Sequence, residues 1–253
     1  MQVRPEGSPA PPGALPTVVA LGAPARPAGI VRPVAEMHDA TEEYLETILE
    51  LEEEGIVPIR ARLVERLGVS APAVSEQVNR LVGGGYTELL DDRSLRLTSK
   101  GRKLATTVVR RHRLAERLLV DVIGLEWEKV HREADLWEHV ISEDVEAKLV
   151  ELLGDPATCP HGNPIPGSHN RFDTKAHVAL ADAPPGVVVV ARISEKLELD
   201  KEALALLATS DLIPGRDAKV TGRDGAGVTM STSTGEHTVP DRLARLMWVT
   251  PAA

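Results

Sequence analysis

Residues 59–98 carry the pattern that most restricts the fold: two short helical stretches around a tight turn, followed by two strands. The first stretch, IRARLVERLG, ends at Gly68. The second begins around Ser70 and Pro72 and stops at three consecutive glycines, residues 83–85. Serine before a helix and proline in its first turn are typical of a helix N-terminus. The following segment, YTELLDDRSLRLT, predicts a hairpin. Together these elements predict a winged helix-turn-helix.

The predicted winged helix has the charge of a DNA-binding surface. Residues 60–117 hold 13 Lys and Arg against 6 Asp and Glu, although the whole chain has a net charge of −9. A basic segment within an acidic chain favours double-stranded DNA as the partner, while a helical bundle with a solvated polar face is the alternative. Polar side chains at a helix start can reach base edges, and arginines can hold phosphates. The candidate DNA-contacting residues are Arg60, Arg62, Ser70, Pro72, Ser75, Glu76, Gln77, Asn79, Arg80 and Arg93.

Composition and periodicity divide the rest of the chain, and predict a mainly α protein with a small β domain. Residues 1–36 are rich in Pro, Ala and Gly without helical or strand periodicity, so we expect them to be disordered and dispensable for DNA binding. Short β-type runs after residue 186 predict a small barrel, interrupted by one helix that Asp200 caps. The expected domains are an extension (1–36), the winged helix (37–100), a helical domain (101–154), a proline-rich linker (155–186) and the β domain (187–253).

A second set of residues has the types and spacing of metal ligands on helix faces. Carboxylate and imidazole groups three or four residues apart share one face of a helix and can hold a divalent metal in a bundle. Each pair alone is more often part of a solvated face, but three helices each carry one part. The candidate ligands are Glu43 and Glu46 on the first helix, His112 and Glu116 on the long basic helix, and His131, Asp135, Glu138 and His139 on a later helix.

The remaining features restrict location and chemistry. Cys159 is the only cysteine, so no disulfide can form within the chain and a reducing cytoplasm is expected. The longest apolar run, residues 186–191, is too short to cross a bilayer, so no membrane partner is expected. Cys159 lies beside Pro160 and His161 in the proline-rich segment, and we interpret it as incidental rather than as a nucleophile.

Six stretches between residues 39 and 167 are specific enough to compare with known families: TEEYLETILELEEEG, RARLVERLGVSAPAVSEQV, DDRSLRLTSKGR, RRHRLAERLL, WEHVISEDVE and HGNPIPG. They resemble the diphtheria-toxin-repressor family of iron- and manganese-dependent regulators. The C-terminal third resembles that family's SH3-like domain more loosely. The resemblance implies a winged helix, a helical dimerisation domain and an SH3-like β-barrel. It also implies a homodimeric repressor that controls metal-homeostasis genes and, because a two-fold dimer presents two equivalent helices, binds a palindromic operator.

The resemblance also implies two metal sites. The primary site would use Glu43, Asp135, Glu138 and His139, and an ancillary site would use His112, Glu116 and His131 with Glu195 and Glu198 from the β domain. Iron-type members have methionine where this chain has Glu43, and cysteine where it has Asp135. Glu46 matches a ligand of manganese-type members, which would place Glu46 and His112 in a paired-metal site. Hard carboxylates suit Mn²⁺ better than thiolate and thioether do, so Mn²⁺ is the expected effector and Fe²⁺, in a repressor of iron-uptake genes, is the alternative.

Two other functions fit part of the pattern. An enzyme with a two-metal carboxylate site would need an open coordination position, and the sequence shows no Ser/His/Asp set or phosphate-binding loop beside it. A winged-helix regulator of an organic effector would use the acidic cluster only structurally. DNA binding with and without a chelator separates the three, because only the metal-dependent repressor loses DNA binding when the metal is removed.

Overall fold

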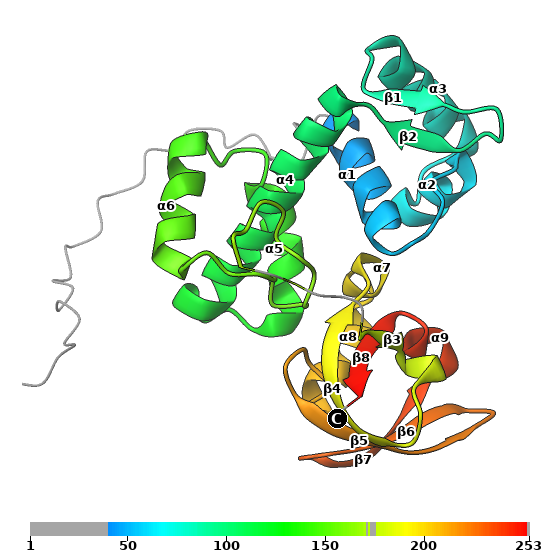
Figure 1. Ribbon diagram of the computed structural model, residues 1–253, viewed down its shortest axis with the longest axis vertical. Coiled ribbons are helices and arrows are strands. Elements are labelled where there is room, and N and C mark those ends of the chain that lie inside the picture. The colour runs from blue at the N-terminus through cyan, green and yellow to red at the C-terminus, as the bar shows by residue number, and fades with distance from the viewer. Residues whose placement is uncertain (1–39, 171, 173–175, 252–253) are drawn as a thin grey trace, which may run out of the picture. The chain divides into compact units, whose positions relative to one another are not determined.

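The computed structural model describes residues 40–170, 172 and 176–251, so the expected disorder of residues 1–36 lies outside the described part of the chain (Figure 1). The first folded unit contains α1 (Ala40–Glu53), α2 (Arg60–Leu67), α3 (Ala71–Gly83), β1 (Thr87–Leu89) and β2 (Leu95–Leu97). Apolar side chains from all three helices and from β2 form one core. Strands β1 and β2 pair antiparallel directly after α3. The predicted winged helix is therefore confirmed.

Local signals in the sequence set the ends of these elements. The hydroxyl of Ser70 accepts a hydrogen bond from the backbone N–H of Ala73 and caps α3, while Pro72 lies in the first turn, as predicted. The N-terminus of the next helix, α4 (Ser99–Arg117), packs against the segment that leads into β1. A Cβ at Gly101 would lie 2.0 Å from the carbonyl oxygen of Tyr86, so only glycine permits this close packing.

The second unit is built around α4. Its other elements are a π-helical segment, η2 (Leu118–Ile123), a 3₁₀ turn, η3 (Trp127–Lys129), α5 (Val130–Trp137) and α6 (Glu143–Leu153). The helix predicted over residues 99–123 thus changes its hydrogen-bonding pattern after Arg117. Helix α4 packs against α1 on one side and against α5 and α6 elsewhere along its length. It therefore connects the winged helix to the helical domain as one continuous helix.

The third unit is a small antiparallel β domain with short helices. Its elements are β3 (Val178–Ala179), η4 (Leu180–Asp182), β4 (Gly186–Ile193), α7 (Glu195–Glu198), α8 (Lys201–Thr209), β5 (Asp217–Asp224), β6 (Gly227–Thr232), β7 (Gly235–Pro240), α9 (Asp241–Ala244) and β8 (Met247–Pro251). The strands pair in the order β3-β8-β4-β5-β6-β7. Asp200 caps α8 as predicted. Strand β7, GEHTVP, lacks an apolar run and was therefore not predictable from the sequence pattern.

Residues 158–166, within the predicted linker, form a loop that is fixed on one side by hydrogen bonds from side chains. Arg110, Arg113 and Arg117 of α4 donate hydrogen bonds to backbone carbonyl groups of this loop, at Pro166, Pro164 and Thr158 respectively. The indole N–H of Trp127 donates to the carbonyl of Pro160 at 3.0 Å. Because arginines three and four residues apart share one face of α4, the helix holds the loop along its length.

The opposite side of the loop contacts the β domain. The backbone N–H of Ile193 donates to the carbonyl of His161 at 3.0 Å. Gly162 has a φ of 86°, and a Cβ there would lie 2.1 Å from the carbonyl oxygen of Ala191, so a larger residue would displace β4. This part of the expected linker is therefore a fixed connection between α4 and β4. None of the helices in the described part of the chain combines the length and the apolar character needed to cross a membrane.

Candidate metal centre and DNA-contacting surface

A cavity of about 600 Å³ is lined by residues of α1, α2, α4, α5 and α7, together with residues that directly follow α5. The cavity contains side chains from all three folded units. The predicted ligands on its wall are Glu43, Glu46, His112, His131, Asp135, Glu138, His139 and Glu195. Most of the metal ligands predicted from the sequence therefore lie around one cavity. The distances between their donor atoms show how they are grouped.

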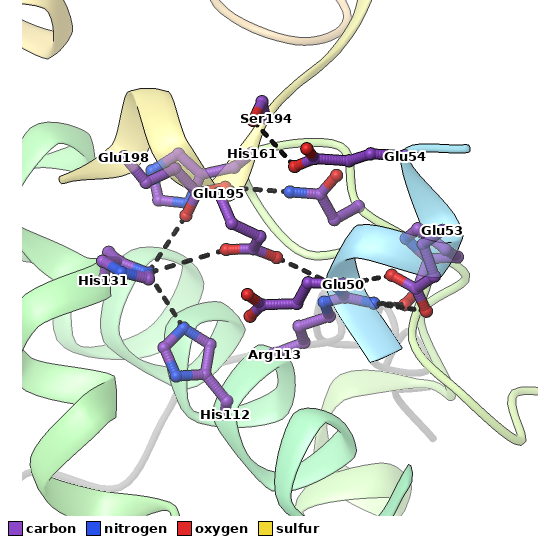
Figure 2. Close-up of polar contacts among 12 residues, drawn as sticks. Glu50, Glu53, Glu54, His112, Arg113, His131, His161, Ser194, Glu195 and Glu198 are labelled. Atoms are coloured by element: carbon purple, nitrogen blue, oxygen red, sulfur yellow. Dashed lines mark hydrogen bonds and ion pairs between the residues drawn. The ribbon is translucent and has the colours of Figure 1, made fainter. Parts of the chain in front are cut away.

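His112 is the central side chain of this cluster. Its Nδ1 lies 2.5 Å from an oxygen of Glu138, and its Nε2 lies 3.1 Å from Nδ1 of His131 and 3.4 Å from an oxygen of Glu116. Two groups of three possible ligand atoms, each within 4.8 Å of one another, share this histidine: one adds Glu46 and Glu138, the other His131 and Glu195. Figure 2 shows His112 and His131 facing each other below α7.

Two further groups extend the cluster from Glu116. One joins Glu116 to His131 and Glu198, and the other joins it to Cys159 and His161. Nδ1 of His161 lies 2.9 Å from an oxygen of Glu116 and 2.8 Å from an oxygen of Glu198. All of these side chains are buried. The expectation that Cys159 is incidental stays a prediction, although the loop places its sulfur among carboxylate and imidazole donors.

The interpretation that Cys159 is not a nucleophile agrees with its surroundings. Burial raises the pKa of this thiol to about 12, and the carboxylate of Glu116 acts in the same direction. A neutral buried thiol is a poor nucleophile, but it can bind a metal as the thiolate and release its proton to solvent or a nearby base. Cys159 and His161 stand two residues apart in the sequence, and this short Cys-x-His spacing is the signal that could have marked them.

The cluster brings several carboxylates close together, with too few positive charges beside them to balance their negative charge. Burial raises the pKa of Glu46 well above its ordinary value, and the nearby carboxylates of Glu138 and Glu50 raise it further. Burial alone would lower the pKa of His112, but the carboxylates of Glu116 and Glu138 outweigh it and raise the pKa well above its ordinary value. A divalent cation that binds these groups would compete with their protons.

The donor atoms fit a divalent metal ion. One oxygen of Glu116, Oε2, and the Nε2 atom of His161 are buried and have no hydrogen-bond partner among the described residues. A buried polar atom without a partner costs free energy, so a native structure usually supplies one. Carboxylate oxygens and imidazole nitrogens are ligands for Mn²⁺, Fe²⁺ and Zn²⁺, and the thiol of Cys159 adds a softer donor at one end.

Three of the predicted ligands lie at the edge of this cluster. Glu43 is exposed, although it lines the same cavity. His139 places Nδ1 at 2.6 Å from an oxygen of Glu42 and Nε2 at 3.2 Å from an oxygen of Glu138. An oxygen of Asp135 lies 3.5 Å from Nδ1 of His112. Within the described residues, none of the groups of three close ligand atoms includes Glu43, Asp135 or His139.

The candidate DNA-contacting residues are mostly accessible on the winged helix. The exposed ones are Arg62, Ser70, Pro72, Glu76, Asn79, Arg80 and Arg93, whereas Arg60 and Ser75 are half-buried. Gln77 differs from the expectation. It is buried, and its amide donates a hydrogen bond to the hydroxyl of Thr41 on α1, so it faces the core instead of solvent.

The wing presents Arg93 on a fixed turn. Arg93 has a φ of 69°, and the carboxylate of Asp92 accepts hydrogen bonds from both the backbone N–H and the hydroxyl of Ser94. These hydrogen bonds lower the pKa of Asp92, so the turn keeps its carboxylate ionised. The turn is therefore preorganised and carries an exposed cation at its tip.

Comparison with known proteins gives a consistent result over most of the chain. Residues 36–95 match the family described as "Iron dependent repressor, N-terminal DNA binding domain", and residues 98–167 match "Iron dependent repressor, metal binding and dimerisation domain". The iron-dependent repressor IdeR of Mycobacterium tuberculosis is 45% identical over 225 residues, covering 85% of this chain and 98% of the relative. The diphtheria toxin repressor of Corynebacterium diphtheriae is 42% identical over 217 residues, covering 83% and 96%.

Solved structures extend the similarity to the C-terminal unit. A structure titled "Manganese-dependent transcriptional repressor complex with manganese" superposes with a TM-score of 0.73 at 31% identity, covering 84% of this chain and all (100%) of that chain. The match supports the predicted architecture of winged helix, helical domain and SH3-like C-terminal domain. The relatives include proteins named for iron and for manganese.

Proposed function

The chain belongs to the iron-dependent repressor family, and from this premise we propose that it is a repressor whose binding to double-stranded DNA requires a divalent metal ion. The family consists of metal-dependent DNA-binding repressors and not of enzymes. The observation that carries the proposal is the group formed by Glu46, His112 and Glu138, because it joins the first helix of the winged helix to the helical domain.

The proposed activation follows from where the ligands lie. A divalent cation supplies the positive charge that lets several carboxylates remain ionised side by side. Glu46 would then hold α1 against His112 of α4 and against Glu138, which directly follows α5. Metal binding would favour the arrangement of α1 relative to α4 and α5 in which these ligands lie close together, and would shift the population toward it. In the dimer, this would set the spacing of the two α3 helices.

We propose Mn²⁺ as the preferred activator in a regulator of metal-homeostasis genes, with Fe²⁺ as the second candidate. The donors around His112 are oxygen and nitrogen, and Glu43 and Asp135 add further carboxylates to the same cavity. Carboxylates bind through one or two oxygens and support the high coordination numbers that Mn²⁺ accepts. Because raw affinity rises from Mn²⁺ to Cu²⁺ at most sites, selectivity must arise from which bound ion gives the DNA-competent geometry.

A metal titration tests this choice. With a duplex selected in vitro by the Mn²⁺-loaded protein, we expect DNA binding to respond to Mn²⁺ more strongly than to Fe²⁺ at matched occupancy under anaerobic conditions. The double change Glu43→Met with Asp135→Cys should broaden the response toward Fe²⁺ and Co²⁺, because thioether and thiolate favour softer ions. Glu133→Gln, at an exposed carboxylate of the same helix as Asp135, is the control. Equal responses to both metals that the double change leaves unaltered would favour Fe²⁺ regulation.

The thiol of Cys159 provides a separate test of the ligand group formed with Glu116 and His161. In protein loaded with Co²⁺, we expect a thiolate-to-metal charge-transfer band that Cys159→Ser abolishes, together with a loss of affinity at this group of about 10-fold. DNA binding at saturating metal should survive, since the group around His112 is intact. The neighbouring change Thr158→Ser is the control. An unchanged Co²⁺ spectrum in Cys159→Ser would show that the sulfur does not bind metal.

We further propose that the helical domain joins two copies of the chain. Its sequence matches a dimerisation domain, and it exposes apolar side chains that a second copy would cover: Val122 and Ile123 in η2, and Val145 and Leu152 in α6. Exposed apolar side chains gathered in one domain are typical of an interface. A two-fold dimer presents two equivalent α3 helices, so the proposed operator is an imperfect palindrome.

The proposed operator contact should depend on salt. Footprinting should show two related half-sites, and affinity should fall steeply as salt rises, because arginines displace counterions from phosphates. Arg93→Ala should weaken binding to all sequences alike and reduce the salt slope by about 1. Arg245→Ala, at an exposed arginine of the C-terminal domain, is the control. A single unpaired half-site or a flat salt response would contradict the dimeric, phosphate-bound arrangement.

A further inference from the structure

The short helix α7 carries two of the candidate metal ligands, Glu195 and Glu198, and Ser194 directly precedes it. Ser194 is fully buried, and its hydroxyl makes two hydrogen bonds. It accepts one from the backbone N–H of Lys196 at 3.1 Å, which caps α7. It donates the other to a carboxylate oxygen of Glu54 at 2.7 Å, as Figure 2 shows. One hydroxyl thus touches both the ligand-bearing helix and the residue that follows α1.

Glu54 also contacts the helix-turn-helix. Its side chain is 3% exposed, and its other oxygen lies 2.7 Å from the guanidinium of Arg66, which is 6% exposed. The oxygen that accepts from Ser194 also accepts a longer hydrogen bond from Arg66, at 3.4 Å. Arg66 belongs to α2, the first helix of the helix-turn-helix. A second ion pair, between Lys196 and Glu65 of α2, runs beside this contact, but both side chains are more than two-fifths exposed. Exposed pairs contribute little, so the buried contact through Ser194 is the stronger connection.

We propose that Ser194 is a positioning residue that couples metal ligation by Glu195 and Glu198 to the placement of α2. This inference rests on the proposed function. A hydrogen bond weakens steeply with distance and angle, and a buried carboxylate oxygen that loses its donor is costly. The ligands and the hydroxyl belong to one short helix and its cap. The position of α7 that metal ligation fixes is therefore the position that decides whether Glu54 keeps its short hydrogen bond from Ser194 or retains only its contacts with Arg66.

The alternative role of Ser194 is to cap α7 and nothing more. Two substitutions separate these roles. Ser194→Ala removes both hydrogen bonds. Ser194→Asp keeps a good helix cap but places a carboxylate against that of Glu54, which removes the donor and adds repulsion. Capping alone predicts that aspartate restores normal behaviour, whereas coupling predicts that aspartate is at least as harmful as alanine. Ser210→Ala is the matched control, since Ser210 is equally buried at the end of α8 in the same domain.

The measurement is the Mn²⁺ concentration that gives half-maximal DNA binding, together with DNA affinity in the presence of chelator. We expect Ser194→Ala to raise the midpoint about 3- to 10-fold, Ser194→Asp to raise it by at least as much, and Ser210→Ala to leave it unchanged. DNA affinity without metal should stay within about twofold, since coupling acts only between the two binding events. A purely structural defect would instead weaken DNA binding under both conditions.

A double-mutant cycle with Glu54→Gln adds an independent measurement. If the two side chains act through their shared hydrogen bond, the double variant raises the Mn²⁺ midpoint by less than the product of the two single fold-changes, those of Ser194→Ala and Glu54→Gln. If their roles are independent, the fold-change of the double variant equals that product. Simple multiplication, restoration by aspartate, or an unchanged midpoint in Ser194→Ala overturns the inference. These outcomes leave the proposed function standing as long as the unaltered protein requires Mn²⁺. An unaltered protein that binds DNA equally well with chelator overturns both.

Discussion

His112→Ala is expected to abolish metal-dependent DNA binding. The imidazole of His112 belongs to two of the groups of close ligand atoms, with a ring nitrogen toward Glu138 and the other toward His131. Its removal leaves Glu46 and Glu138 without the imidazole they share, and also takes one of the three ligands from the group with His131 and Glu195. We expect metal affinity to fall by more than about 100-fold, since even the loss of a supporting contact to a ligand costs 10- to 100-fold. Calorimetry with Mn²⁺ and gel-shift assays measure the two effects.

The matched control is His237→Ala, which removes an imidazole of β7 that belongs to none of the ligand groups found in the described residues. It should bind Mn²⁺ and DNA as the unaltered protein does. Circular dichroism checks that His112→Ala remains folded, because losing a buried side chain also affects packing. A folded His112→Ala protein that still requires Mn²⁺ for DNA binding, at an unchanged midpoint, would remove His112 from the metal centre.

Arg113→Ala is expected to lower the free energy of unfolding by about 3–5 kcal/mol, because it leaves the buried carboxylate of Glu195 and the half-buried carboxylate of Glu53 without their cation. The guanidinium of Arg113 is 1% exposed and binds both oxygens of Glu53 at 3.2 and 2.7 Å. It also lies 2.9 Å from Glu195 and donates to the carbonyl of Pro164. One side chain thus joins α1, α4, α7 and the loop of residues 158–166. Urea unfolding measures the change.

Arg102→Ala is the control for this loss. Arg102 lies on the same helix, and its ion pair with Glu52 has a 2.7 Å separation, but its side chain is 48% exposed. A pair in such contact with water contributes at most about 1 kcal/mol. If the two substitutions cost the same, the buried ionic contacts of Arg113 do not stabilise this fold, and the units depend on apolar packing instead.

The winged helix was predictable from the sequence because its signals are local. Ser70 caps α3 with its own side chain, and the candidate contacts of α3 follow from the helical period. The same period also places Gln77 on the face of Val74, Val78 and Leu81, which is the buried face of α3. The polar character of Gln77 led to the prediction of a DNA contact, but its amide donates to Thr41 of α1 instead.

The metal centre was predictable where its ligands have helical spacing. The spacing of His112 and Glu116 indicates one face of α4, but the helix expected to carry Asp135, Glu138 and His139 ends at Trp137, so Glu138 and His139 lie in the turn after α5. Glu43 and Glu46 stand one helical turn apart, so spacing alone could not show that Glu46 lies among the close donors while Glu43 is exposed.

Cys159 and His161 were not predicted as ligands, for a different reason. Their loop has no periodic pattern, and its position depends on contacts with α4 and β4 that are distant in sequence. No local signal reports that Arg117 and Ile193 approach the same few residues. Such contacts exist only once the chain has folded around them.

The loop of residues 158–166 also bears on how the protein matures on the ribosome. Its partners on α4 have already left the exit tunnel when the loop emerges, but β4 and α7 follow only later in synthesis. Until then the backbone N–H of Ile193 and the carboxylates of Glu195 and Glu198 are absent, and Glu116, His131 and His161 lack these partners. The nascent winged helix can therefore fold before the metal centre is complete, so a truncated translation product would carry the DNA-contacting surface without its full metal control.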